Sequence, residues 1–245
     1  MWTKRSDALS ILVADSLSRS FGAVNVIDRL DLRLDAGEIL GIIGPNGAGK
    51  TTFFNLIAGV MRPSGGSICF EGRDITGLAT WDRCRLGIGR TYQVPKPYAH
   101  MSVYENVLVA AVHGGGLPLR DAHNEVEGAL DLTGLSHAHA IPSGQLTLLD
   151  LKRLELCRAL SIRPRLLLLD EIAGGLTDAE SHVLLDIIRH VHARGAAIIW
   201  IEHVIHALRR LATRLVVLYS GNFVVDGTPE EVLADARAKS IYLGE

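Results

Sequence analysis

One short run in the first quarter of the chain has residue types and spacing suited to binding phosphate: Gly44-Pro45-Asn46-Gly47-Ala48-Gly49-Lys50-Thr51, followed by Thr52. It fits the pattern G-x-x-x-x-G-K-[ST], in which glycines let backbone N–H groups turn toward phosphate oxygens. In such a loop, Lys50 places its charge on the β- and γ-phosphates and Thr51 gives its hydroxyl to Mg²⁺. A glycine-rich structural turn is the alternative. The apolar run before the loop and the helical pattern after it favour the phosphate loop, because the positive end of that helix dipole would face the anion.

Two adjacent carboxylates, Asp170 and Glu171, follow an apolar run at 166–169. Successive strand residues face opposite ways, so the two side chains can take different roles. We expect Asp170 to bind Mg²⁺ directly or through water, and Glu171 to orient the attacking water and accept its proton. A solvated strand end is the commoner explanation of such a pair alone, but the phosphate loop disfavours it. The glutamate predicts a hydrolase.

These residues need a sheet to bring them together. Apolar runs alternate with helical patterns, which indicates parallel strands joined by crossover helices. The expected core strands are apolar at consecutive positions, as in strands covered on both faces: 39–43, 166–169, 197–201 and 215–218. An antiparallel piece is expected from 11–14, 30–34 and 67–71, and a mostly helical insertion from about 103–160. After residue 220 we expect a short strand and a helix capped by Thr228.

Composition limits the class of protein. The 245 residues are 48% hydrophobic and 21% charged, with a formal net charge of −2, which argues against a nucleic-acid partner held by counterion release. The length allows one large domain or two small ones. Three scattered cysteines exclude a disulfide framework or a zinc cluster. Without a bilayer-spanning apolar run or a signal-peptide core, the sequence predicts an intracellular protein that reaches a membrane only through a partner.

Along nearly its whole length the chain resembles the ATP-binding-cassette family of transporter ATPases, because its phosphate loop and acidic pair stand in that family's order. The resemblance implies ATP and Mg²⁺ as ligands and a single nucleotide-binding domain over residues 1–245. The implied fold is α/β: a RecA-like P-loop NTPase core with an N-terminal antiparallel β subdomain, a helical subdomain inserted at about 94–160 and a tail at about 220–245.

The same resemblance implies roles for further residues. Gln93 looks like the glutamine that links Mg²⁺ and the attacking water to the membrane-subunit contact, and His203 looks like the switch histidine that contacts the γ-phosphate. Phe21 resembles the aromatic residue that stacks on adenine, and the run at 174–177 resembles a loop that reaches across a dimer. Each of these residues, taken alone, has an ordinary structural explanation. The assignments therefore rest on the order and spacing of the residues along the chain.

Several segments are similar to the ATPase subunits of branched-chain amino-acid importers: G-I-G-R-T-Y-Q-V-P at 87–95, M-S-V-Y-E-N-V at 101–107, G-T-P-E-E-V at 227–232 and Y-L-G-E at 242–245. Related ATPases for urea, amides and lipopolysaccharide export share several of them. The solute therefore stays open.

The chain departs from the family's signature, usually L-S-G-G-Q, which opens the helix that caps ATP on the opposite subunit. The run Ser143-Gly144-Gln145 looks similar, but the spacing to R-A-L at 158–160 places the signature at Leu146-Thr147-Leu148-Leu149-Asp150. Thr147 keeps a hydroxyl for the γ-phosphate. Leucines replace both glycines, and they would crowd the approach to phosphate. Asp150 would oppose its charge, although the helix N-terminus offsets part of that cost.

The resemblance implies an importer ATPase on the cytoplasmic face of the inner membrane. Its partners would be transmembrane permease subunits, a second ATP-binding subunit (another copy or a paralogue) and, indirectly, a periplasmic solute-binding protein. The loop at 94–101, stiffened by two prolines, is the expected permease contact, with an ordinary exposed loop as the alternative. A lipid or lipopolysaccharide exporter ATPase and a weakly active conformational module are the alternative functions. A cassette ATPase for translation or DNA repair is disfavoured, because the chain has no extended heptad pattern.

Overall fold

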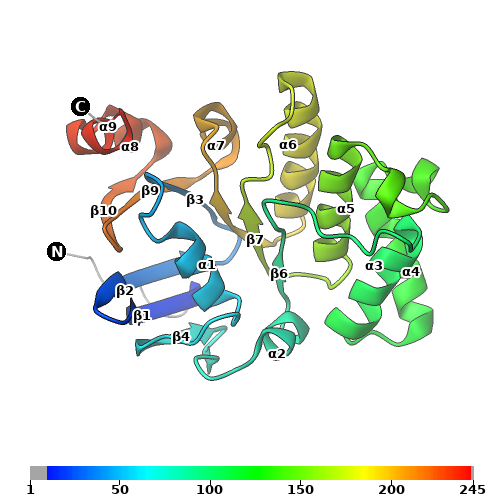
Figure 1. The fold of residues 1–245 in the computed structure, drawn as a ribbon, viewed down its shortest axis with the longest axis horizontal. Coiled ribbons are helices and arrows are strands. Elements are labelled where there is room, and N and C mark those ends of the chain that lie inside the picture. The colour runs from blue at the N-terminus through cyan, green and yellow to red at the C-terminus, as the bar shows by residue number, and fades with distance from the viewer. Residues whose placement is uncertain (1–9, 244–245) are drawn as a thin grey trace.

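The computed structural model describes residues 10–243, so the last two residues of the Y-L-G-E segment lie outside it. Its centre is a six-stranded sheet in the order β10-β9-β3-β8-β7-β6 (Figure 1). The strands are β3 (Ile39–Ile43), β6 (Ile88–Arg90), β7 (Leu166–Asp170), β8 (Ala197–Ile201), β9 (Arg214–Tyr219) and β10 (Asn222–Gly227). All but β10 run parallel. The four predicted core strands are confirmed, and β3, β7 and β8 are buried along their whole length.

A second, antiparallel sheet packs on one side of the first. Its order is β2-β1-β4-β5, formed by β1 (Ser10–Phe21), β2 (Val24–Asp35), β4 (Gly65–Phe70) and β5 (Arg73–Asp74). The helix α1 (Lys50–Ile57) lies between the two sheets (Figure 1). Its Phe53 and Phe54 share one buried apolar cluster with Leu12 of the antiparallel sheet and Ile42 of the central one. The loop that leads into α1 is therefore held from both sides.

Helices cover the other face of the central sheet and extend beyond its β6 end. They comprise α3 (Val103–Val109), a π-helical turn (Ala110–Gly114), α4 (Leu119–Thr133), α5 (Leu148–Leu160), α6 (Asp178–Ala193), α7 (Ile205–Leu211), α8 (Pro229–Ala234) and α9 (Ala236–Leu243). The short helix α2 (Thr80–Arg85) lies on the α1 side instead, where Arg83 donates to the carbonyl oxygens of Leu56 and Ile57. Short 3₁₀ turns at Ser136–Ala138 and Ser143–Gln145 connect α4 to α5. The predicted helical insertion is confirmed, and α3, α4 and α5 form the green group in Figure 1. Among residues 10–243, no helix has the length and apolar character needed to cross a bilayer.

The antiparallel sheet differs from its prediction in length. β1 and β2 each have 12 residues, although the apolar alternation predicts only 11–14 and 30–34. Register shifts between the strands interrupt that alternation, and Ser16 and Arg29 adopt positive φ at these irregularities. The strand β6 escapes prediction because Ile-Gly-Arg is too short to show a period. As predicted, Thr228 caps α8, with Pro229 in its first turn.

Candidate functional site

The phosphate-loop residues connect the buried strand β3 to α1, as their pattern requires. Gly44 has φ 157°, and a Cβ there would stand 2.1 Å from the carbonyl oxygen of Leu218. Gly49, with φ 106°, precedes α1, and a Cβ there would stand 2.9 Å from the carbonyl oxygen of Val26. Around Gly47, by contrast, the space next to Cα is open. Glycine is needed where the loop packs on the protein, and the other side of the loop is free for a ligand.

Lys50 begins α1, and its side chain is nearly enclosed, with 7% of the residue exposed. Its ammonium donates hydrogen bonds to the carbonyl oxygens of Gly44 (2.7 Å) and Pro45 (3.0 Å). Burial lowers the pKa of Lys50, and the nearby carboxylates Glu171 and Asp170 oppose that shift. A phosphate oxygen would compete with these two carbonyl groups for the same ammonium.

Two of the three predicted catalytic side chains meet at the carboxylate of the third, Glu171. Gln93 Nε2 donates to Glu171 Oε2 at 2.5 Å, and His203 Nε2 lies 2.7 Å from Glu171 Oε1. They come from different places: Gln93 follows β6, Glu171 follows β7 and His203 follows β8. Because β6, β7 and β8 are adjacent and parallel, their carboxyl ends bring these segments to one edge of the sheet.

The second carboxylate, Asp170, ends β7 and is held by a different partner. Its Oδ2 lies 3.3 Å from Nη2 of Arg90, whose Nη1 donates to Asn55 Oδ1 at 2.7 Å. Burial raises the pKa of Asp170, and the charge and hydrogen bond of Arg90 oppose that rise. The two adjacent carboxylates therefore have separate surroundings, as the alternation along a strand predicts.

A cavity of about 590 Å³ collects most of the predicted residues, which lie on α1, its preceding loop and the three strand ends: Asn46, Gly47, Gly49, Lys50, Thr51, Thr52, Gln93, Glu171 and His203, with Val26 added from β2. Its size is in the range of small-molecule sites. Of the other predicted residues, Gly44, Pro45, Ala48 and Asp170 lie beside it in the chain but do not line it. Phe21 lies at the end of β1, 45% exposed with Arg19 over its ring, and does not line the cavity either.

Oxygen donors that line this cavity, together with the adjacent Asp170, suit a magnesium–triphosphate. The Thr51 hydroxyl, the Gln93 amide oxygen and the Asp170 carboxylate are the hard ligands that Mg²⁺ prefers. The open side of Gly47 and the N-terminus of α1 offer backbone N–H groups to phosphate. The residues present therefore fit both expected ligands.

Glu202 and Lys152 are among the buried charged residues that the sequence analysis missed. Glu202, directly before His203, accepts backbone hydrogen bonds from Ala173 (3.2 Å), His203 (3.0 Å) and Val204 (3.3 Å). Burial raises its pKa despite these bonds. Lys152 on α5 is 5% exposed, and burial lowers its pKa. The sequence offered one sign that Lys152 is buried: it lies one helical turn from both Leu148 and Leu156, and so on the same face as two apolar residues.

The segment at the signature position forms the start of α5. Thr147 is the N-cap: its hydroxyl accepts from the Asp150 backbone N–H (3.2 Å) and donates to the Asp150 carboxylate (3.0 Å). The Asp150 carboxylate also pairs with Arg153 at 3.0 Å. Leu148, the first helical residue, is 45% exposed. The helix thus begins where the spacing argument places it, and not at the 3₁₀ turn Ser143–Gln145.

The family model, the similar proteins and the solved structures that match this chain all concern ATP-binding proteins of ABC transporters or related export systems. Residues 27–174 match the sequence family described as ABC transporter. The chain is 30% identical to the probable branched-chain amino acid transport ATP-binding protein LivG of Methanocaldococcus jannaschii, covering 98% of this chain and 99% of that protein. It is 32% identical to the lipopolysaccharide export system ATP-binding protein LptB of Acidithiobacillus ferridurans, covering 96% and 97%. Among solved structures, the ADP conformation of an ATP-binding cassette of an ABC transporter superimposes with a TM-score of 0.88 at 28% identity, covering 97% of this chain and 100% of that one.

Proposed function

Because the chain belongs to the ABC transporter family of ATPases, we propose that it is the ATP-hydrolysing subunit of an importer for branched-chain or other hydrophobic amino acids or related small solutes. The observation that carries hydrolysis is the meeting of Gln93 and His203 at the Glu171 carboxylate, beside the loop that holds Lys50. The LivG names of two similar proteins and the importer-like segments of the sequence support the solute class.

The proposed reaction is attack of water on the γ-phosphate of ATP, which breaks the bond from that phosphorus to the β–γ bridging oxygen and releases ADP and inorganic phosphate. Glu171 takes the proton of that water, while Gln93 and His203 fix the direction of its carboxylate. Lys50 binds the β- and γ-phosphate oxygens after leaving its loop carbonyls. Mg²⁺, held by Thr51, Asp170 and Gln93, would neutralise charge on the triphosphate.

We further propose that the chain is one nucleotide-binding domain that works in pairs, with another copy or a paralogue, on transmembrane permease subunits at the cytoplasmic face of the inner membrane. The loop at 94–101 is the proposed permease contact. Its Val94 and Tyr98 are 67% and 50% exposed, which leaves apolar and aromatic surface beside Gln93. A periplasmic solute-binding protein would act on the permease, not on this chain.

Lipopolysaccharide or lipid export is the second candidate, because LptB proteins match the chain as strongly as LivG proteins do. Reconstitution separates the two. The chain is to be placed in liposomes with the membrane subunits that co-purify with it, and phosphate release measured with and without a periplasmic binding protein loaded with leucine. Stimulation by the loaded binding protein is expected. Stimulation by lipopolysaccharide instead would favour export.

A weakly active conformational module is the third candidate, favoured by the leucines at the signature position. ATP titration beside phosphate release distinguishes it. Saturable MgATP binding with no phosphate release, both alone and with the membrane subunits, would contradict the proposed hydrolase.

A further inference from the structure

The ammonium of Lys152 connects α5 to both sides of the catalytic contact. It donates to the backbone carbonyl oxygen of Gln93 at 2.8 Å and to that of Glu171 at 3.3 Å. These are the two residues whose side chains meet at 2.5 Å. One buried cation therefore fixes the main chain of both partners in that contact, from a helix that belongs to neither segment.

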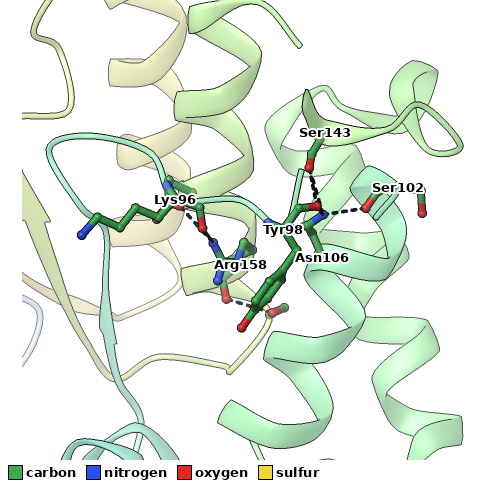
Figure 2. A network of polar contacts seen from close by, with 8 residues as sticks. Lys96, Tyr98, Ser102, Asn106, Ser143 and Arg158 are labelled. Carbon is green, nitrogen blue, oxygen red and sulfur yellow. Dashed lines mark hydrogen bonds and ion pairs between the residues drawn. The ribbon is translucent and has the colours of Figure 1, made fainter. Parts of the chain in front are cut away.

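Two further charged residues on the same face of α5 hold the loop after Gln93. Glu155 accepts the backbone N–H of Lys96 at 2.9 Å, and Arg158 donates to the Lys96 carbonyl oxygen at 3.0 Å. Glu155 and Arg158 also pair with each other at 3.0 Å. Lys152, Glu155 and Arg158 lie at intervals of three residues along α5. Lys152 binds the start of the loop at Gln93, and the next two turns both bind Lys96; Figure 2 shows Lys96 beside Arg158.

The far end of the loop is fixed by buried polar side chains (Figure 2). Asn106 on α3 accepts the Tyr98 backbone N–H at 2.8 Å and donates to the Ser143 hydroxyl at 3.1 Å. That hydroxyl donates to the Tyr98 carbonyl oxygen at 2.9 Å. Asn106 and Ser143 are both fully buried. The loop is thus bound along its length to the helical part of the chain. Of the side chains that hold it, Lys152 also donates to the Glu171 backbone.

We propose that Lys152 is a positioning residue for ATP hydrolysis: it holds the Gln93 and Glu171 backbones in register with α5, so that the signature helix, the Gln93 loop and the catalytic carboxylate move together. The proposal rests on the proposed ATPase function. Lys152 does not line the nucleotide cavity, so its loss acts on turnover and not on nucleotide binding. We expect the charged ammonium group of Lys152 and its hydrogen bonds, and not the apolar part of the side chain, to be required for turnover.

The test compares Lys152→Met, which keeps the length of the side chain, with Lys152→Arg, which keeps the charge and donors. At saturating MgATP, we expect kcat to fall by about tenfold or more in Lys152→Met, with the Kd for MgATP within about twofold of the parent. Lys152→Arg should recover most of the lost turnover. Two controls are matched to the change: Lys239→Met removes an exposed lysine, and Val126→Ala lowers stability in α4 without touching these contacts.

A second readout needs no turnover. In nucleotide-free protein, hydrogen exchange of peptides covering 93–98 should be about tenfold faster in Lys152→Met and near the parental rate in Lys152→Arg. Parental turnover and exchange in Lys152→Met would overturn the proposal, as would an equal loss of kcat in Val126→Ala. If the parent itself hydrolyses no ATP, the proposed function fails, whereas exchange still decides whether Lys152 holds the loop.

Discussion

The chemistry of the site centres on the backbone and side chain of Glu171. Its φ of 46° lies in the left-handed region, which costs a non-glycine residue about 1–3 kcal/mol. Its backbone N–H donates to the Ile201 carbonyl oxygen at 2.9 Å, and its carboxylate contacts Gln93 and His203. Contacts on both sides maintain the unusual conformation, and they direct the carboxylate into the cavity.

Replacing this carboxylate should separate binding from hydrolysis. Glu171→Gln keeps the shape of the side chain but cannot accept the proton of the attacking water, so kcat for phosphate release should fall by about 10²- to 10⁴-fold. The Kd for MgATP should stay close to the parental value. Parental turnover in this variant would show that another group is the base.

Glu202 allows a pH-dependent test of the same region. Because its pKa in the folded protein is raised above the ordinary 4.5, the folded state binds more protons than the unfolded chain in the window above pH 4.5. Its contribution to the free energy of unfolding therefore falls as pH rises through that window. Glutamine does not titrate, so the stability of Glu202→Gln relative to the parent should improve from pH 4.5 toward neutrality, as measured by urea unfolding. A difference independent of pH would contradict this.

Sequence order and spacing identified the side chains of the site that touch Glu171, but not those that support them. Gln93 and His203 follow short strands at the places that the resemblance implies. Lys152 and Glu202 were missed because their charged side chains are buried. Most charged residues are exposed to solvent, so the sequence alone favours exposed positions for both. The folded chain encloses both: Lys152 reaches the backbone of Gln93 and Glu171 from α5, and Glu202 accepts backbone N–H groups of residues 173, 203 and 204.

At the scale of elements, the predicted bounds were accurate where a segment is buried on all sides. The strands β3 and β8 match their predicted bounds because five consecutive apolar residues covered on both faces leave a clear signal. The strands β1 and β2 were underestimated because bulges break their alternation. The start of α5 was found from spacing and confirmed by the Thr147 cap.

The exposed leucine at the start of α5 offers an element-level test of the altered signature. Leu148→Gly removes a side chain from the surface proposed to face the ATP of the second subunit. If that side chain raises the barrier by about 1 kcal/mol, hydrolysis should become about fivefold faster. Phosphate release by the complex with its membrane subunits measures this. Leu119→Gly is the matched control, since Leu119 is also the exposed first residue of a helix. Equal or slower hydrolysis in Leu148→Gly alone would show that the leucine does not obstruct the site.

At the scale of the whole molecule, the cavity lies where two cores meet. One apolar cluster joins the antiparallel sheet, α1 and one face of the central sheet, and the other joins the opposite face to the helical part. The phosphate loop belongs to the first, whereas α5, which carries Lys152, packs in the second. Ligand binding at this junction should therefore stabilise the fold as a unit.

Nucleotide should raise the stability of the whole chain through this junction. At a free MgATP concentration of 100 times Kd, the free energy of unfolding should increase by about 2.7 kcal/mol. Lys50→Met should lose this gain at the same concentration, because its ammonium is the charge in the phosphate loop. Denaturant unfolding with and without MgATP measures both. An equal gain in Lys50→Met would mean that the nucleotide binds elsewhere.

The most direct measurement is a crystal structure of Glu171→Gln with MgATP. We expect the triphosphate in the loop at 44–51, with Lys50 Nζ moved from the Gly44 and Pro45 carbonyl oxygens to phosphate oxygens and the metal beside Thr51 and Asp170. Nucleotide bound at another site, or Lys50 still bonded to its own loop beside an ordered triphosphate, would contradict it.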